Sequence, residues 1–287
     1  MNNTRAILLM IGAMASFALV DMFVKLLSRS QSAGQIIAVS SLATFAVFAL
    51  WVWRDGGRLL TPLALNKPLL IRSTGEVIGS IGIVMALALA PLSSVAALGQ
   101  AQPLAVTLMA ALFLGEKVGW RRWSAVFLGF IGVLIIIRPG LGAFDPNLLW
   151  VFLYIFGLAA RDVASRALPS DVSTPFAVAW AMIPMTLAGA TLMPFQGGWQ
   201  VIGGGAALLY IALTLAVCVA LWMITSALRT GEVSTVAPFR YTRILFALTI
   251  AFIIFDEVPD LWTWVGAALI VGSGVYAFLR ERRLQQR

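Results

Sequence analysis

Long apolar runs, broken by short clusters of charged residues, Gly and Pro, set the pattern of this chain. Residues 172–228 contain no charged side chain and are interrupted only near 197–198 and 203–205. Residues 77–115 also lack charge, and this run breaks at Pro91. Because a helix that crosses a bilayer needs about 20 mostly apolar residues, each run is expected to hold two crossings.

Applied to the whole chain, this pattern predicts an all-α membrane protein with ten transmembrane helices. The fifth is short, but Arg121, Arg122 and Arg138 at its ends can extend toward the membrane surface. The spans are expected near residues 6–28, 34–53, 69–90, 94–115, 121–137, 147–165, 174–195, 203–228, 232–255 and 259–280.

Several residues of the first half of the chain recur in the second half, 141 positions later. Asp21 and Lys25 correspond to Asp162 and Arg166. The same spacing relates Ser93, Val95, Ala96, Glu116 and Trp123 to Ser234, Val236, Ala237, Glu257 and Trp264, and Gly132-Val133 matches Gly274-Val275 with a slip of one. We therefore predict two five-helix repeats within one membrane unit, residues 1–140 and 141–287.

An odd number of crossings in each repeat would turn the second copy upside down relative to the first. Inverted repeats of this kind are typical of alternating-access carriers, in which the substrate site lies near the bilayer midplane where the repeats meet. The repeat pattern thus favours a transporter.

Lys and Arg are divided unequally between the two sides that ten spans define. Thirteen fall on the side of both termini, and only Lys25, Arg29 and Arg138 on the other. The positive-inside rule then puts both termini in the cytoplasm, in a multi-pass protein of the cytoplasmic (inner) membrane. Because this asymmetry accounts for most of the formal charge of +8, we expect the lipid bilayer and no nucleic acid as a partner.

The composition agrees with a membrane protein and argues against several kinds of metal, cofactor and catalytic site. Apolar residues make up 61% of the chain and charged residues 11%, against about 25% charged in soluble domains. There is no His, and Cys218 is the single Cys, so no zinc-type ligand set and no cofactor are expected. No Walker-type phosphate loop is present. An enzyme with two aspartates, Asp21 and Asp162, would have them near opposite membrane faces, so no enzymatic activity is expected.

Several motifs resemble a known family. Leu112-Phe113-Leu114-Gly115-Glu116-Lys117, with Trp123 and Gly129-x2-Gly132-Val133 after it, is similar to the signature of the drug/metabolite transporter superfamily in its EamA-type ten-helix branch. Ile254-Phe255-Asp256-Glu257 with Trp264 and Gly272-x-Gly274-Val275 repeats it, and Phe17-x3-Asp21-x3-Lys25 and Arg138-Pro139-Gly140 also fit. Within the branch the chain most resembles bacterial exporters of aromatic amino acids, which implies that kind of substrate.

Charges inside the predicted spans need a reason, since each costs about 2.5–3.5 kcal/mol to insert. Three acid–base pairs have i,i+4 spacing, Asp21–Lys25, Arg72–Glu76 and Asp162–Arg166, which allows local neutralisation. Glu76 is the deepest of these carboxylates. It is either a structural partner of Arg72 or a proton-coupling group whose pKa would rise on desolvation if Arg72 turned away.

Arg240 and Arg243 lie deeper, about 12 and 16 Å into the ninth predicted helix. Neither has an acidic residue within four positions, and Pro238 frees a backbone carbonyl at that level. Two interpretations stay open: the arginines pair with Asp21, Glu76, Asp162 or the freed carbonyls, or they line an anion-binding cavity. Under the second, the polar end of the substrate would be held by Gln100, Gln102, Arg240, Tyr241 and Arg243.

Four further residues are candidates for an apolar wall around the substrate. Trp180 and Trp222 lie deeper than the other eight tryptophans, which are at span ends. Phe239 adjoins Arg240, and Met85 belongs to a group of adaptable methionines. Packing within the helices would explain the tryptophans and methionines equally well.

We therefore expect a secondary transporter that exports small organic solutes by alternating access. The expected substrates are amino acids with aromatic or apolar side chains. The alternative in the same fold is an importer or exchanger of another metabolite or drug, including anionic solutes. A non-transporting membrane sensor is the alternative from another class. Nothing in the pattern requires more than a monomer.

The orientation can be tested by labelling single cysteines in a Cys218→Ala background. Cysteines in residues 30–33, 141–146 and 256–259 should react with an impermeant reagent from outside. Those in 56–66, 117–120 and the C-terminus should stay protected, because the positive side faces the cytoplasm. External labelling within 56–66 would contradict the predicted orientation.

Overall fold

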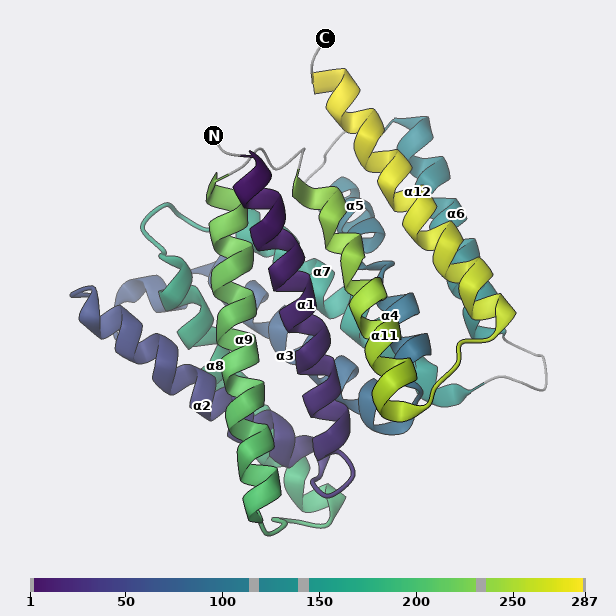
Figure 1. The fold of residues 1–287 in the computed structure, drawn as a ribbon. Coiled ribbons are helices and arrows are strands. Elements are labelled where there is room, and N and C mark those ends of the chain that lie inside the picture. The colour runs from purple at the N-terminus through teal and green to yellow at the C-terminus, as the bar shows by residue number, and fades with distance from the viewer. Residues whose placement is uncertain (1–2, 114–118, 139–144, 231–235, 286–287) are drawn as a thin grey trace. The chain divides into compact units, whose positions relative to one another are not determined.

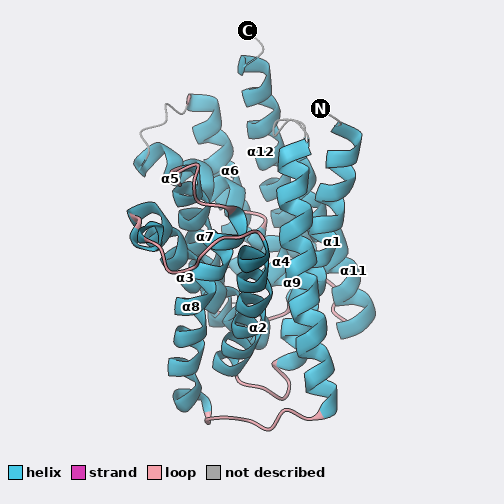
Figure 2. Ribbon diagram, turned by 90° about the vertical axis from the view of Figure 1, so that its left-hand side faces the viewer, coloured by secondary structure: helices cyan, strands magenta, loops and turns pink. Residues whose placement is uncertain are grey.

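The computed structural model describes residues 3–113, 119–138, 145–230 and 236–285. Within these ranges the chain consists of helices and connecting loops and contains no strand (Figures 1 and 2). In the first half the helices are α1 (Asn3–Leu27), α2 (Ala33–Arg54), η1 (Pro62–Leu65), α3 (Lys67–Leu89), α4 (Leu92–Gly99), α5 (Gln102–Phe113) and α6 (Trp120–Ile137). In the second half they are η2 (Pro146–Leu149), α7 (Trp150–Arg166), α8 (Thr174–Leu192), η3 (Met193–Gln196), α9 (Gly204–Thr230), η4 (Ala237–Thr242), α11 (Arg243–Phe255) and α12 (Leu261–Gln285).

Eight apolar helical segments of the described chain are long enough to cross a membrane. Two shorter ones, Trp123–Ile137 and Leu261–Ala277, fall on the fifth and tenth predicted spans. The prediction of an all-helical, multi-pass membrane protein is therefore confirmed. Ten crossings and their inverted orientation stay predictions.

Serine side chains start two of the helices. Ser32 caps α2 by accepting a hydrogen bond from the backbone N–H of Gln35, and Ser173 caps α8 by accepting one from Phe176. Such caps satisfy backbone donors that the first turn of a helix leaves free. The two caps are 141 residues apart, which is the spacing of the predicted repeat.

The chain divides into two compact units, each built from both halves of the sequence. Unit 1 comprises residues 1–22, 90–148 and 216–287, and unit 2 comprises residues 23–89 and 149–215. The predicted repeats, 1–140 and 141–287, do not coincide with these units, and their boundary stays a prediction.

In unit 1, α6 packs along α12 and α4 packs against α11 (Figure 1). The first pair is close because glycines face each other. A Cβ on Gly132 would lie 2.7 Å from the carbonyl oxygen of Gly266, so a larger residue would push these backbones apart. At the N-terminus of α4, the Glu257 carboxylate accepts a hydrogen bond of 2.9 Å from the Ser93 backbone N–H. Their predicted counterparts, Glu116 and Ser234, lie outside the described residues.

In unit 2, α3 packs along α7 and α2 along α8. The α3–α7 contact is a backbone contact, because a Cβ on Gly157 would lie 2.7 Å from the Cα of Gly79. A Cβ on Gly34 of α2 would lie 2.8 Å from the carbonyl oxygen of Gly189 in α8. Small residues at such crossings allow the close helix packing that stabilises membrane bundles.

Three of these packed pairs join helices that hold the same place in the two predicted repeats. These are α2 with α8, α4 with α11, and α6 with α12. The pairing supports the repeat interpretation, because a pseudo-two-fold axis between two repeats places equivalent helices that lie near the axis side by side.

The α3–α7 crossing can be tested with Gly157→Ala. The added methyl should force the backbones apart and destabilise the protein by about 1–3 kcal/mol, as overpacking does. Gly272→Ala in α12 is the matched control, because among the described residues no heavy atom beyond its chain neighbours and its own helix backbone lies within 4 Å of the place that its Cβ would take. It should leave the melting temperature unchanged or raise it slightly, since Ala favours helix by up to ~1 kcal/mol over Gly. Equal melting temperatures for both variants in detergent would contradict the close crossing.

Candidate functional site

A largely buried ion pair in unit 1 joins α1 to α11. Arg243 donates from Nη2 to both carboxylate oxygens of Asp21, each at 2.7 Å, and from Nε to Oδ2 at 3.2 Å. The two side chains are 17% and 4% exposed, respectively. The pair thus sits largely inside the protein, and we call it the ionic centre of unit 1.

Small residues bring the two helices close enough for this contact. Ala18 of α1 and Ala247 of α11 are fully buried in one cluster together with Ala96 of α4. Ala18 precedes Asp21 by three residues and Ala247 follows Arg243 by four, so each alanine lies one turn away on the face that carries the charge. Sequence reasoning raised Asp21 as one of several partners for the arginines, and the fold selects it.

An aromatic side chain borders the ionic centre. The guanidinium carbon of Arg243 lies 5.5 Å from the centre of the Phe17 ring, within the range of a cation–π interaction. Phe17 and Phe239 pack against the same buried apolar cluster, which includes Met10 of α1. The ionic centre therefore presents a cation, an anion and an aromatic ring together.

The other predicted polar residues of unit 1 have different surroundings. Arg240 in η4 is partly buried, and within the part of the chain that the structure describes no carboxylate lies within 4.0 Å of its guanidinium. Tyr241 is buried, and its ring lies against α12, where a Cβ on Gly274 would be 2.5 Å from its Cζ.

Gln100 is buried and donates to the Ala96 carbonyl oxygen at 3.2 Å. Gln102 is partly buried at the start of α5.

The predicted apolar residues are spread over both units. Trp222 of unit 1 is 51% exposed on α9. Trp180 of unit 2 packs beside Phe176 and donates from Nε1 to the Leu59 carbonyl oxygen at 2.8 Å. Met85 of unit 2 accepts a hydrogen bond on Sδ from Gln196 at 3.6 Å.

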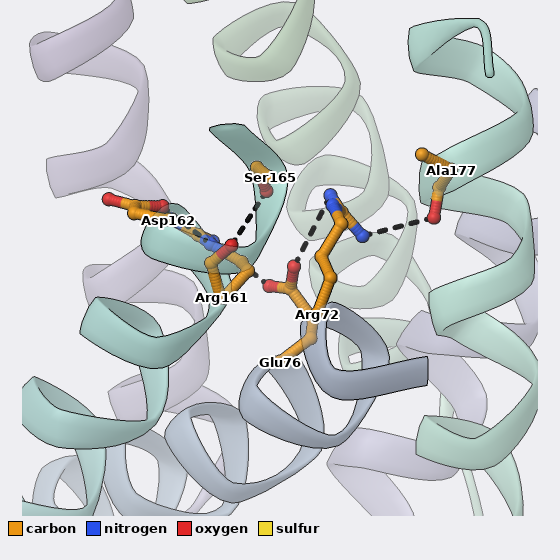
Figure 3. Close-up of polar contacts among 6 residues, drawn as sticks. All are labelled: Arg72, Glu76, Arg161, Asp162, Ser165 and Ala177. Carbon is orange, nitrogen blue, oxygen red and sulfur yellow. Dashed lines mark hydrogen bonds and ion pairs between the residues drawn. The ribbon is translucent and has the colours of Figure 1, made fainter. Parts of the chain in front are cut away.

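Unit 2 holds a second group of charges, shown in Figure 3. Glu76 of α3 accepts a hydrogen bond of 3.1 Å from Arg161 Nη1 and lies 3.7 Å from Arg72 Nη2. Arg161 also contacts Asp162 Oδ1 at 2.8 Å through Nη2, and Arg72 donates to the Ala177 carbonyl oxygen of α8 at 3.0 Å. We call Arg72, Glu76, Arg161 and Asp162 the charge cluster of unit 2.

Arg161 is the residue that sequence reasoning missed. The i,i+4 rule correctly paired Arg72 with Glu76, but it cannot detect a partner 85 residues away on another helix. A signal was available in the glycines, because Gly75 and Gly157 mark the α3–α7 crossing. A Cβ on Gly75 would lie 2.7 Å from the backbone nitrogen of Arg161, which puts Arg161 beside α3.

A group of glutamines in unit 2 was also missed. The Gln35 side chain is fully buried and pairs with the backbone of Gln200, accepting from N and donating to O, both at 2.8 Å. It also donates to Gln31 at 2.6 Å. Gln196 accepts from the Gly34 backbone N–H at 2.8 Å. These bonds hold the segment after α8 against the start of α2, so the glutamines have a structural role.

Outside the spans, Arg138 after α6 pairs with Asp260 before α12. Partial burial raises the pKa of the Asp260 carboxyl, but hydrogen bonds from the Thr263 hydroxyl, from Arg138 and from the Thr263 backbone outweigh it and lower the pKa below its ordinary value. No group of three metal-ligating side chains occurs among the described residues.

The ionic centre can be tested by removing its charges singly and together. Arg243→Gln should cost about 3–5 kcal/mol, because it leaves a buried carboxylate without its partner. Adding Asp21→Asn should recover most of that loss. The matched control is the partly exposed pair, where Arg138→Gln and Asp260→Asn should each cost about 1 kcal/mol or less. Thermal unfolding in detergent measures both, and an Arg243→Gln protein as stable as the wild type would contradict the pairing.

Comparison with known proteins identifies the family to which the chain is similar. The model of the EamA-like transporter family matches residues 4–138 and again residues 146–279. A crystal structure that covers 99% of this chain and 99% of its own has a TM-score of 0.64 at 20% identity, a likeness of fold alone.

Several curated transporters are similar to the chain. An S-adenosylmethionine uptake transporter of Rickettsia felis is 25% identical, with 70% of this chain and 68% of the relative covered. A riboflavin transporter of Rhizobium johnstonii is 27% identical, with 75% and 72% covered. A pseudopaline exporter of Pseudomonas aeruginosa is 27% identical, with 92% and 93% covered. Since the family model matches most of the chain in two successive stretches, the protein belongs to the EamA-like transporter family of the drug/metabolite transporter superfamily.

Proposed function

We propose that this transporter exports amino acids with aromatic or apolar side chains across the cytoplasmic membrane by alternating access. Membership of the EamA-like family makes the chain a membrane transporter. The proposal concerns the substrate and the direction. The single observation that carries the substrate assignment is the ionic centre of unit 1, in which Asp21 and Arg243 pair beside Phe17.

A zwitterionic amino acid is complementary to such a pair. Its carboxylate can take the bidentate donors of Arg243, and its ammonium group can bind the carboxylate of Asp21. The charges of the protein are then satisfied both with and without substrate, so neither state leaves an unpaired charge inside the membrane. An aromatic side chain can stack on Phe17, which already borders the guanidinium.

The remaining candidates are assigned by their contacts. In the proposal, Arg240, Gln100 and Gln102 complete the polar end of the site, with Phe239 and Trp222 on its apolar side. The contacts of Tyr241 with Gly274, of Trp180 with Leu59 and of Met85 with Gln196 support packing for these three.

A second candidate is transport of another metabolite through the same fold, including uptake. What supports it are the names of the relatives, an S-adenosylmethionine uptake transporter, a riboflavin transporter and a pseudopaline exporter. They differ in substrate and in direction, so transport of each solute must be compared directly.

The test is competition for transport of labelled L-phenylalanine in proteoliposomes. Phenethylamine lacks the carboxylate and 3-phenylpropionate lacks the ammonium group. Each should compete about ten- to a hundredfold more weakly than L-phenylalanine, because each loses a charge-assisted contact of about 1.5–3 kcal/mol. S-adenosylmethionine and riboflavin serve as competitors for the second candidate.

The double variant Asp21→Asn with Arg243→Gln removes both charges of the ionic centre. It should fold, and its preference for the zwitterion should disappear. A double variant that still transports L-phenylalanine with wild-type preference would refute the assignment of Asp21 and Arg243. Wild-type transport of S-adenosylmethionine or riboflavin, without transport of L-phenylalanine, would replace the first candidate by the second.

A further inference from the structure

Two guanidinium groups converge on one carboxylate in the charge cluster of unit 2. Glu76 lies between Arg161 of α7 and Arg72 of its own helix (Figure 3). It follows Lys67 by nine residues, so it is about 14 Å along α3. The side chains of Arg72, Glu76 and Arg161 are 11%, 15% and 20% exposed. The carboxylate is therefore sheltered but keeps a small exposed surface.

The elements packed around α3 supply few other charges. From α7 come Arg161 and Asp162, with Arg166 exposed at the end of that helix. Helix α8 has no charged residue and offers the Ala177 carbonyl oxygen to Arg72. Helix α2 has one charge, Arg54, which is its last residue. Lys67 begins α3 and is exposed.

The charges of the cluster sum to zero, since two arginines face two carboxylates. A net charge within a membrane span is costly, so states of the cluster that keep this balance are favoured. If a proton neutralised Glu76 alone, the cluster would carry +1. If an anion entered alone, the cluster would carry −1, and the anion would face the Glu76 carboxylate at close range. Only the two events together restore neutrality.

We propose that Arg72 and Arg161 form a proton-linked anion site, in which protonation of Glu76 lets a small carboxylate bind to the two guanidiniums. The proton comes from water and adds to a carboxylate oxygen of Glu76, and no other bond changes. The incoming carboxylate then takes over the donors that Glu76 used, with the planar fork geometry that guanidinium offers to such groups. Asp162 stays on Arg161 as the constant counter-ion.

This site would link anion binding to proton binding within unit 2. Binding of the anion and of the proton favour each other by the same factor, because linkage between two sites is reciprocal. A solute with one carboxylate would therefore bind with one proton. The inference does not rest on the proposed substrate, because it uses residues of unit 2 and not the ionic centre of unit 1.

The test measures proton uptake when benzoate binds to the purified protein in detergent, with benzyl alcohol as the uncharged control. The wild type should take up one proton per benzoate bound. Its affinity for benzoate should fall as the pH rises, by at most about tenfold per pH unit, as expected for one linked proton. Absence of proton uptake at saturating benzoate would overturn the proposal without any variant.

Variants then assign the proton to Glu76. Glu76→Gln should bind benzoate with no pH dependence, because the amide mimics the protonated acid. Combining Glu76→Gln with Arg161→Gln restores neutrality without an anion and should weaken benzoate binding at least about tenfold, since one of the two charged donors is lost. A Glu76→Gln protein that retains the wild-type pH dependence would overturn the assignment.

Two controls separate this site from other effects. Asp260→Asn removes a carboxylate outside the spans and should leave both proton uptake and affinity unchanged. The variant Asp21→Asn with Arg243→Gln lacks the ionic centre, and proton-linked benzoate binding should persist in it. Loss of that binding together with amino-acid transport would trace the signal to unit 1 and reject the site in unit 2.

Discussion

The ion pair between Asp21 and Arg243 shows the constraint on which this structure depends. A chain that is 61% apolar has little polar material to satisfy a charge inside its helices, so a buried charge is costly unless it meets an opposite one. Arg243 meets Asp21 with three donor–acceptor contacts of 2.7–3.2 Å. That pairing ties α1 to α11 and at the same time leaves a cation and an anion where a zwitterion could replace them.

The same constraint is met differently in unit 2. There Arg161 contacts two carboxylates and Glu76 contacts two guanidiniums, so the charges form a chain from α7 through α3 to the backbone of α8. Glycines make this chain possible, because Gly75, Gly79 and Gly157 bring the backbones of α3 and α7 into contact. At this crossing, the close packing of α3 and α7 is thus also what brings the opposite charges together.

The repeated sequence and the packing are related without being the same. Helices that hold equivalent places in the two halves pack as pairs, such as α2 with α8. As a result each compact unit takes helices from both halves. Glu257 illustrates the consequence, since its carboxylate in the second half holds the start of α4 in the first.

The fold class, the approximate ends of most helices and the family could all be inferred from the sequence alone. Apolar length, the 141-residue spacing and motifs such as Phe17-x3-Asp21-x3-Lys25 are local signals or simple repeats, and these survive in a single chain. The sequence also identified Arg72 with Glu76, because i,i+4 neighbours are fixed by the helix itself.

Which distant charges meet depends on how the helices pack against one another. Arg243 had three acidic candidates, and it pairs with Asp21, one turn from the buried cluster of Ala18, Ala96 and Ala247. Arg161 gained Glu76 because Gly75 and Gly157 allow their helices to touch. Trp180, a candidate for the substrate wall, donates its indole N–H to the carbonyl oxygen of Leu59, 121 residues away. The physical reason is common to all three: a partner on another helix depends on which faces pack together, and sequence spacing within one helix carries no record of that.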